Sequence, residues 1–141
     1  MRLLIDTNVF LEYVLQREKN QTVHDLFFLS AMKKNQTVVT SMSLRDIGYI
    51  IHKAYHDERK TRQMQIEIYS MVSKVIDTTA DAAIESLYSD AKDYEDSLQM
   101  IAAEEAMCDA IITFNKKDFE NSKLPVFTPE EIIDVWSKSS R

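Results

Sequence analysis

Short apolar runs and longer amphipathic stretches alternate along the chain. Apolar or β-branched runs predict five strands, at residues 2–5, 37–40, 74–77, 110–113 and 125–127. Between them, apolar residues recur every three or four positions and predict helices over residues 9–15, 20–34, 43–56, 58–74, 81–90 and 93–107. Strands that alternate with helices favour a parallel sheet covered on both faces. The predicted fold is therefore α/β, a three-layer α/β/α sandwich with a mainly parallel central sheet.

Two helix starts carry capping signals. Ser41 and Ser43 can each cap the helix that follows the second strand. Thr128, followed by Pro129 and by Glu131 at the third helical position, predicts a capping box and a last helix. The chain shows no linker, internal repeat or low-complexity stretch, so residues 1–141 are expected to form a single domain.

Composition narrows the class of protein. No apolar run is long enough to span a membrane, and the N-terminus lacks the layout of a signal peptide. The lone cysteine, Cys108, fits a reducing compartment and is interpreted as a core residue, so a cytoplasmic protein is expected. Gly48 is the one glycine, which excludes the glycine-rich loops that cradle phosphates. The net charge of −6 disfavours nucleic acid unless cations neutralise it or basic residues cluster locally.

Three aspartates follow predicted strands. Asp6 ends the first strand, Asp46 lies early in the helix after the second, and Asp118 follows the strand at 110–113. The carboxyl ends of parallel strands share one edge of the sheet, where open α/β sheets bind ligands. We therefore expect the three carboxylates to converge. For Asp6 an alternative stays open, because an aspartate at this position can also cap the next helix.

A fourth carboxylate comes from the helix at 93–107. Asp96 shares a helix face with Met100, Ala103 and Met107, and an acid among apolar residues must be paired, protonated or bound to a metal. Asp93 lies one turn earlier on nearly the same face. The alternative for both is the favourable placement of acids in the first turn of a helix.

Four like charges at one edge repel each other unless divalent cations hold them together. Carboxylates without paired histidine or cysteine select a hard ion, so one or two Mg²⁺ or Mn²⁺ ions are expected. Such ions usually act on phosphate oxygens, activating a water and stabilising the leaving oxygen.

Four motifs occur in order along nearly the whole chain: Leu-Ile-Asp-Thr-Asn, an acid early in the helix after the second strand, Asp-x-x-Asp-x-Leu-x-x-x-Ala-Ala, and Ile-Thr-x-Asn-x-x-Asp-Phe. Together they resemble the PIN-domain ribonucleases, chiefly the stand-alone VapC-type toxins. The resemblance implies a metal-dependent endoribonuclease, the toxin of a type II toxin–antitoxin system, with an RNA substrate, a small antitoxin protein as partner, and a homodimer.

The resemblance also implies roles for individual residues. The family's catalytic and metal-binding acids carry over to Asp6, Asp46, Asp96 and Asp118. Its supporting polar side chains, which orient ligands or waters, carry over to Thr7, Asn8, Thr113 and Asn115. The chain departs from the family at Asp46, where a glutamate is usual. The shorter side chain is expected to reach a metal through water, with Asp93 as a fifth acid.

Several basic residues have two interpretations each. Arg45, Lys53, Lys116 and Lys117 are candidate contacts to RNA phosphates, or ordinary surface charges. His52 and His56 have metal-ligand spacing on one helix, but no third ligand is evident nearby, so a solvated face is favoured over a zinc site.

Two other functions stay open at this point. A Mg²⁺-dependent phosphatase that uses Asp6 as its nucleophile also fits a strand-end aspartate, although such enzymes want a second aspartate where Asn8 stands. A PIN-like nucleic-acid-binding module with little or no catalysis is the non-enzymatic alternative.

Overall fold

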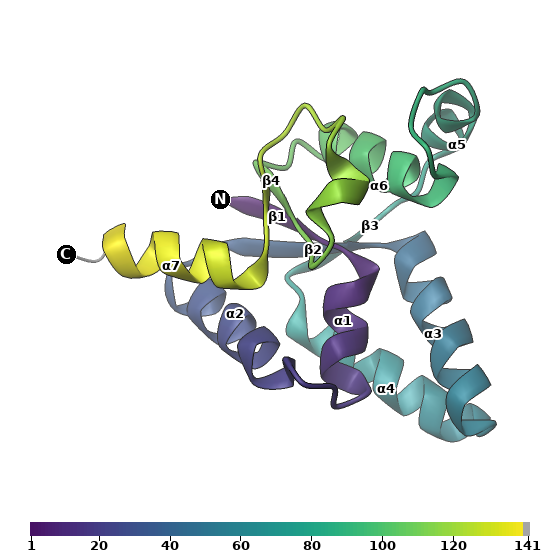
Figure 1. Cartoon of the computed structure of the whole chain (residues 1–141). Helices are drawn as coiled ribbons and strands as arrows, with labels where there is room; N and C mark the ends of the chain where they lie inside the picture. Colours follow the sequence, from purple (N-terminus) through teal and green to yellow (C-terminus); the bar gives the residue numbers. More distant parts are fainter. Residues whose placement is uncertain (140–141) are drawn as a thin grey trace.

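A five-stranded sheet runs through the middle of the computed structural model, which describes residues 1–139 (Figure 1). The strands are β1 (Arg2–Ile5), β2 (Gln36–Thr40), β3 (Lys74–Ile76), β4 (Ala110–Ile112) and β5 (Val126–Phe127). They lie in the order β3-β2-β1-β4-β5, and all four neighbouring pairs are parallel. The predicted parallel sheet is confirmed, with β1 at its centre.

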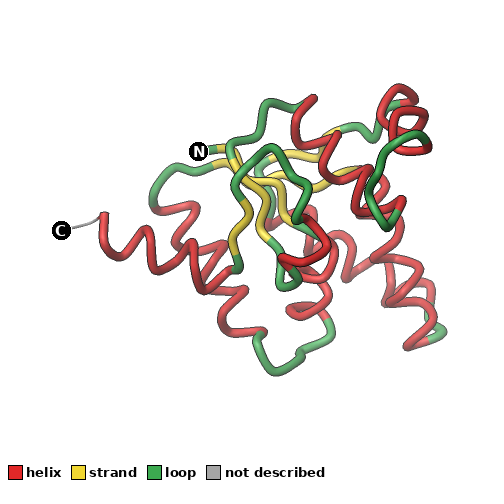
Figure 2. The backbone as a smooth tube through the Cα atoms, turned by 45° about the horizontal axis from the view of Figure 1, so that its top comes forward, coloured by secondary structure: helices red, strands yellow, loops and turns green. Residues whose placement is uncertain are grey.

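Helices cover both faces of the sheet, which gives the three predicted layers (Figure 2). They are α1 (Thr7–Val14), α2 (Asn20–Met32), α3 (Ser41–Tyr55), α4 (Glu58–Met71), α5 (Ala80–Leu87), α6 (Tyr94–Glu105), the 3₁₀ helix η1 (Lys116–Phe119) and α7 (Pro129–Ser139). Leu3 and Ile5 pack against one helical layer, whereas Leu4 packs toward α6. Alternate residues of β1 therefore fill two separate cores, as expected of a strand buried on both faces.

The helix starts follow from local capping. The capping box at the last helix is confirmed, because Thr128 N–H donates to Glu131 Oε1 at 2.9 Å and Glu131 N–H donates to Thr128 Oγ1 at 3.1 Å. The cap predicted at Ser41 or Ser43 is wrong. Helix α3 begins at Ser41 because Thr40 is its N-cap, with a hydroxyl that accepts from Ser43 N–H at 3.0 Å.

The carboxyl ends of β1, β2 and β4 lead into α1, α3 and η1. Helix α6 packs across the other face of the sheet beside η1, and Figure 1 shows it crossing above β1 and β2. Cys108 is buried in the core, as expected. Between residues 1 and 139, no helix has the length and apolar character needed to cross a membrane.

Candidate active site at the ends of the parallel strands

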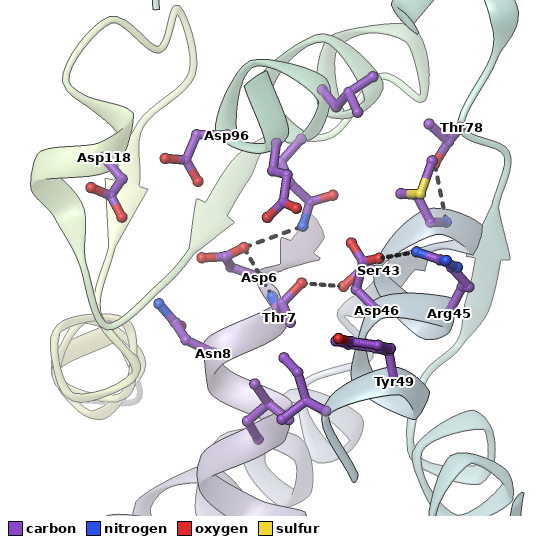
Figure 3. A pocket seen from close by; sticks show the side chains of 16 residues that line it. Asp6, Thr7, Asn8, Ser43, Arg45, Asp46, Tyr49, Thr78, Asp96 and Asp118 are labelled. Carbon is purple, nitrogen blue, oxygen red and sulfur yellow. Dashed lines mark hydrogen bonds and ion pairs between the residues drawn. The ribbon is translucent and has the colours of Figure 1, made fainter. Parts of the chain in front are cut away.

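A pocket of about 510 Å³ opens at the carboxyl edge of the sheet (Figure 3). Five carboxylates line it: Asp6, Asp46, Glu95, Asp96 and Asp118. They come from four segments far apart in the sequence, namely the end of β1, helix α3, helix α6 and η1. Figure 3 shows Asp6 between Asp46 on one side and Asp96 with Asp118 on the other. All four acids predicted from the sequence therefore face the same pocket.

Asp6 is held rigidly at the centre of this group. Its Oδ1 accepts from the backbone N–H of Thr7 at 2.9 Å and from Gln99 Nε2 at 3.2 Å, and its Oδ2 accepts from Thr113 Oγ1 at 2.9 Å. The side chain also caps α1. The capping interpretation of Asp6 is confirmed, and the same carboxylate also faces the pocket.

Thr113 supports Asp6 from behind. It is fully buried, and its hydroxyl, besides donating to Asp6, accepts from Asn8 Nδ2 at 3.2 Å and from Asn115 N–H at 3.1 Å. Asn115 in turn donates through Nδ2 to Asp118 Oδ2 at 2.7 Å. The predicted polar residues thus form a hydrogen-bonded chain from Asn8 to Asp118, beneath the carboxylates.

The opposite wall of the pocket comes from α3. The Thr7 and Ser43 hydroxyls lie 2.6 Å apart and join α1 to α3. Asp46 accepts from Arg45 Nη1 at 3.2 Å, and its side chain is 24% exposed. Within residues 1–139, Asp46 is therefore the one acid of the predicted four that forms an ion pair, and Arg45 partly balances its charge.

Burial and repulsion among the acids both act on Asp96. Burial, followed by the charges of Asp93, Asp118, Asp6 and Glu95, raises the pKa of Asp96 from 3.8 to about 7. A carboxyl with this pKa keeps a proton part of the time near neutral pH. The negative charge of the carboxylates in this pocket is therefore not fully balanced by nearby cations. A bound metal ion would balance part of it.

Asp6 and Glu95 respond in the same direction. Burial raises the pKa of Asp6, with a smaller contribution from Asp118, while the hydrogen bonds from Thr113, Gln99 and Thr7 lower it. Burial and then the charges of Asp46, Asp93 and Asp6 raise the pKa of Glu95. The negative charges of acids on both sides of Asp6 thus raise the pKa of carboxyl groups across the pocket.

Other predicted residues lie outside the pocket lining. Asp93 is the N-cap of α6 and accepts from Asp96 N–H at 3.1 Å, the structural alternative considered for it. Lys116 pairs with Glu131 at 3.2 Å, on the side of α7. Lys53, in the last turn of α3, and Lys117, on η1, are exposed and do not line the pocket. Of the four basic candidates, Arg45 alone lines it.

Several pocket residues had not been predicted, among them Gln99, Glu95 and Tyr49. Gln99 is buried, donates to Asp6 and accepts from Thr40 Oγ1 at 3.0 Å. Its signal in the sequence is a polar residue one turn after Asp96 in an otherwise apolar stretch. Glu95 lines the pocket where Asp93 had been expected as the fifth acid. Tyr49, one turn after Asp46, lines the pocket with an exposed ring.

The donor set fits a hard divalent cation. Within residues 1–139, no three His, Cys, Asp or Glu side chains are grouped so that they could hold a metal ion. Mg²⁺ keeps several waters and needs only one or two carboxylates, so a looser ring of acids suits it. Asp6 Oδ2 accepts one hydrogen bond, whereas Oδ1 accepts two, which leaves Oδ2 free to bind a cation.

The histidine pair on α3 does not form a metal site. The rings of His52 and His56 meet edge to face, with centroids 6.3 Å apart, and His52 Nδ1 lies 3.6 Å from Glu58. Both side chains are exposed, and no third ligand joins them within the described residues. Both histidines therefore lie on a solvent-exposed face, as expected.

Similar folds occur in solved structures. A chain in the structure of VapBC2 from Rickettsia felis, bound to a DNA fragment from the promoter, has a TM-score of 0.69 and 16% identity over 89% of this chain and 97% of that chain. A toxin–antitoxin complex from Klebsiella pneumoniae has a TM-score of 0.62 and 24% identity over 90% and 97%. VapC20 of Mycobacterium tuberculosis, described as a sarcin-ricin loop cleaving toxin, has a TM-score of 0.65 and 13% identity over 82% and 92%.

The sequence itself identifies the family. A search of curated proteins found no match. The family model of the PIN domain, however, matches residues 2–117, which span β1 to η1 and include every carboxylate of the pocket except Asp118. Together with the parallel sheet and the acids at its carboxyl edge, this match shows that the chain belongs to the PIN domain family.

Proposed function

We propose that this protein is a Mg²⁺- or Mn²⁺-dependent endoribonuclease that hydrolyses RNA phosphodiesters as the toxin of a toxin–antitoxin pair. The observation that carries the proposal is the ring of five carboxylates around one pocket, with the pKa of Asp96 raised to about 7. Membership of the PIN domain family supports nuclease chemistry. The similarity to VapBC2 and to the sarcin-ricin loop cleaving toxin supports the toxin role and an RNA substrate.

Each group of residues has a distinct task in this proposal. Asp6, Asp96 and Asp118 would surround a hydrated cation, with one or two of these carboxylates binding it directly and water bridging the rest. Asp46, the shorter replacement of the usual glutamate, would act through water. Gln99 and Thr113 fix the Asp6 carboxylate through hydrogen bonds of 3.2 and 2.9 Å. When bound, the cation supplies the positive charge that favours attack by water on a phosphodiester and stabilises the leaving oxygen. Arg45, which lines the pocket, would contact a phosphate of the substrate.

Purified protein should cut single-stranded or loop RNA with Mn²⁺ or Mg²⁺ and lose activity with a chelator. Because water is the nucleophile, the 2′-hydroxyl is not consumed, and the products should carry 5′-phosphate and 3′-hydroxyl ends. End analysis of the fragments by mass spectrometry checks this result. Recovery of 2′,3′-cyclic phosphate ends would exclude the mechanism.

The geometry of Asp6 disfavours the phosphatase alternative. Asp6 is 8% exposed, and only its Oδ2 keeps a lone pair for a further partner, which the cation would occupy in the proposed nuclease. A phosphatase would need this oxygen as the nucleophile and a second aspartate where Asn8 stands. Hydrolysis of a simple phosphate monoester, with no cleavage of RNA, would restore that alternative. Calorimetry with Mn²⁺ separates the enzyme from a binding module that has lost its metal, because only the enzyme should bind the ion in the pocket.

We also propose a small antitoxin protein as the partner, supported by the VapBC2 and Klebsiella pneumoniae complexes among similar structures. An amphipathic segment of the partner would enter the acid-lined pocket and pair a basic side chain with the carboxylates. We expect affinity purification from the native host to recover a small protein whose removal releases nuclease activity. Repeated purification without a partner, together with harmless expression of the chain alone, would contradict the toxin role. The homodimer stays a prediction, to be checked by light scattering.

A further inference from the structure

A second groove lies next to the acidic pocket and shares a wall with it. It measures about 530 Å³ and runs between α3 and α4. Its lining includes Ser41, Gly48, His52, Glu58, Thr61 and Gln65. Arg45 and Tyr49, one helical turn apart on α3, line both the groove and the acidic pocket. A chain molecule bound at the acids can therefore continue into the groove by crossing these two side chains.

The floor of the groove depends on Gly48. A Cβ at this position would collide with the side chain of Gln65, whose Nε2 donates to the carbonyl oxygen of Leu44 at 3.0 Å. The glycine thus leaves room on α3 for the end of the Gln65 side chain. The lining of the groove therefore combines the amide of Gln65 and the hydroxyls of Ser41 and Thr61 with apolar Leu44.

Charge along α3 and α4 differs from the rest of the chain. Residues 45–62 contain five Lys and Arg against three Asp and Glu, whereas the remaining residues contain 12 against 20. The one acid in the groove, Glu58, is paired with Arg62 at 2.9 Å and lies 3.6 Å from His52. A phosphate chain is thus repelled less here than over the rest of this acidic protein.

Tyr49 offers an aromatic surface at the junction. It is 62% exposed, and Figure 3 shows its ring at the mouth of the acidic pocket, one turn below Asp46. An exposed ring beside a cation is the combination that binds single-stranded nucleic acid, because a base stacks on the ring while the cation holds a phosphate. An apolar protein helix is a poorer fit, since most of the residues that line the groove have polar or charged side chains.

We propose that single-stranded RNA leaves the acidic pocket across Tyr49 and Arg45 and continues into the groove between α3 and α4. Tyr49 stacks on a base next to the scissile phosphate, and Arg45 contacts the neighbouring phosphate. The inference rests on the proposed function and names the path of its substrate.

The test measures binding of a fluorescein-labelled single-stranded RNA of about 12 nucleotides, within the usual range of site sizes. The binding assay contains a chelator, so that no cleavage occurs. Tyr49→Ala should weaken binding about 5- to 100-fold, the usual effect of losing one stacked base, while Tyr49→Phe keeps wild-type affinity. Tyr69→Ala is the matched control, because Tyr69 is also 62% exposed, on α4, but does not line the groove. It should bind RNA as wild type does.

Salt dependence separates the two contacts. Arg45→Gln should lower the slope of log affinity against log salt by about one, whereas Tyr49→Ala should leave the slope unchanged. With metal present, Tyr49→Ala should raise KM for RNA more than it lowers kcat. Melting curves of each variant verify folding, which the exposed positions should not disturb.

Three outcomes overturn the inference: equal RNA affinity of wild type and Tyr49→Ala, no RNA binding by wild type, or loss of the protein partner alone in the Tyr49 variant. Failure of the proposed function is recognised separately. In that case wild type cleaves no RNA with Mn²⁺, although binding without metal can still depend on Tyr49.

Discussion

Asp96→Asn is expected to leave the metal-free protein at least as stable as wild type and to remove nearly all RNA cleavage. The change removes one charge from a group in which burial and neighbouring acids raise the pKa of Asp96 to about 7, and the amide keeps almost the same shape. After screening, the gain in unfolding free energy should be about 1 kcal/mol. Activity should fall at least about 100-fold, the upper end of what loss of an outer partner of a metal site costs.

Melting curves with and without Mn²⁺, together with one RNA cleavage assay, decide this prediction. A ligand that binds the folded state stabilises it by mass action, so Mn²⁺ should raise the melting temperature of wild type more than that of the variant. A variant that is less stable than wild type yet fully active would show that Asp96 serves only the start of α6.

The same variant predicts a pH dependence. The pKa of Asp96 is about 7 in the folded protein, whereas the ordinary pKa of an aspartate, which applies to the unfolded chain, is 3.8. Below pH 3.8 the carboxyl is protonated in both states, and as the pH rises toward 7 the unfolded chain loses the proton first. Wild-type stability should therefore fall with rising pH across this window, relative to Asp96→Asn. Denaturant titrations of both metal-free proteins at pH 4 and pH 7 measure the difference.

Thr113→Val should cause the largest loss of stability among single changes at the site. Valine keeps the shape of threonine, but the fully buried hydroxyl donates to Asp6 and accepts from Asn8 and Asn115. Leaving these partners unsatisfied should lower the unfolding free energy by about 1–3 kcal/mol. Activity should fall roughly 10- to 100-fold, because Asp6 loses a hydrogen bond that orients it.

Thr37→Val is the control for this change. Thr37 is also buried, but it lies at the start of β2, away from the pocket, where its hydroxyl accepts from Ser73 N–H at 3.3 Å. It should lose about 1 kcal/mol or less and keep its activity. Equal activity losses in the two valine variants would mean that Thr113 acts only through global stability.

The fold, and the convergence of the four aspartates on one pocket, could be predicted from the sequence pattern. Strand periodicity locates the strand ends, and a parallel sheet brings those ends to one edge, so Asp6, Asp46 and Asp118 converge without knowledge of any side-chain contact. Asp96 was found because an acid stood on an apolar helix face. These predictions rest on backbone geometry and on the cost of burying charge.

The supporting contacts could not be predicted in the same way. The hydrogen bond from Gln99 to Asp6 joins residues 93 positions apart, and no local pattern specifies it. Asp93 was expected at the pocket, but Glu95 lines it instead. The reason is the rotation of α6 about its axis, since the side chain of Asp93 turns back to cap the helix. Lys116 was a candidate for a phosphate contact or for an ordinary surface charge, and in the structure it pairs with Glu131 on α7.

The central place of β1 has a consequence for the newly made chain. One edge of β1 pairs with β2, and its other edge pairs with β4. Because Leu3 pairs with Ala110, β1 cannot have both neighbouring strands until Ala110 has been synthesised. Asp118 comes later still. While the ribosome is synthesising the chain, the acids therefore cannot assemble until about residue 118 has emerged. The carboxylate pocket is incomplete for most of the synthesis.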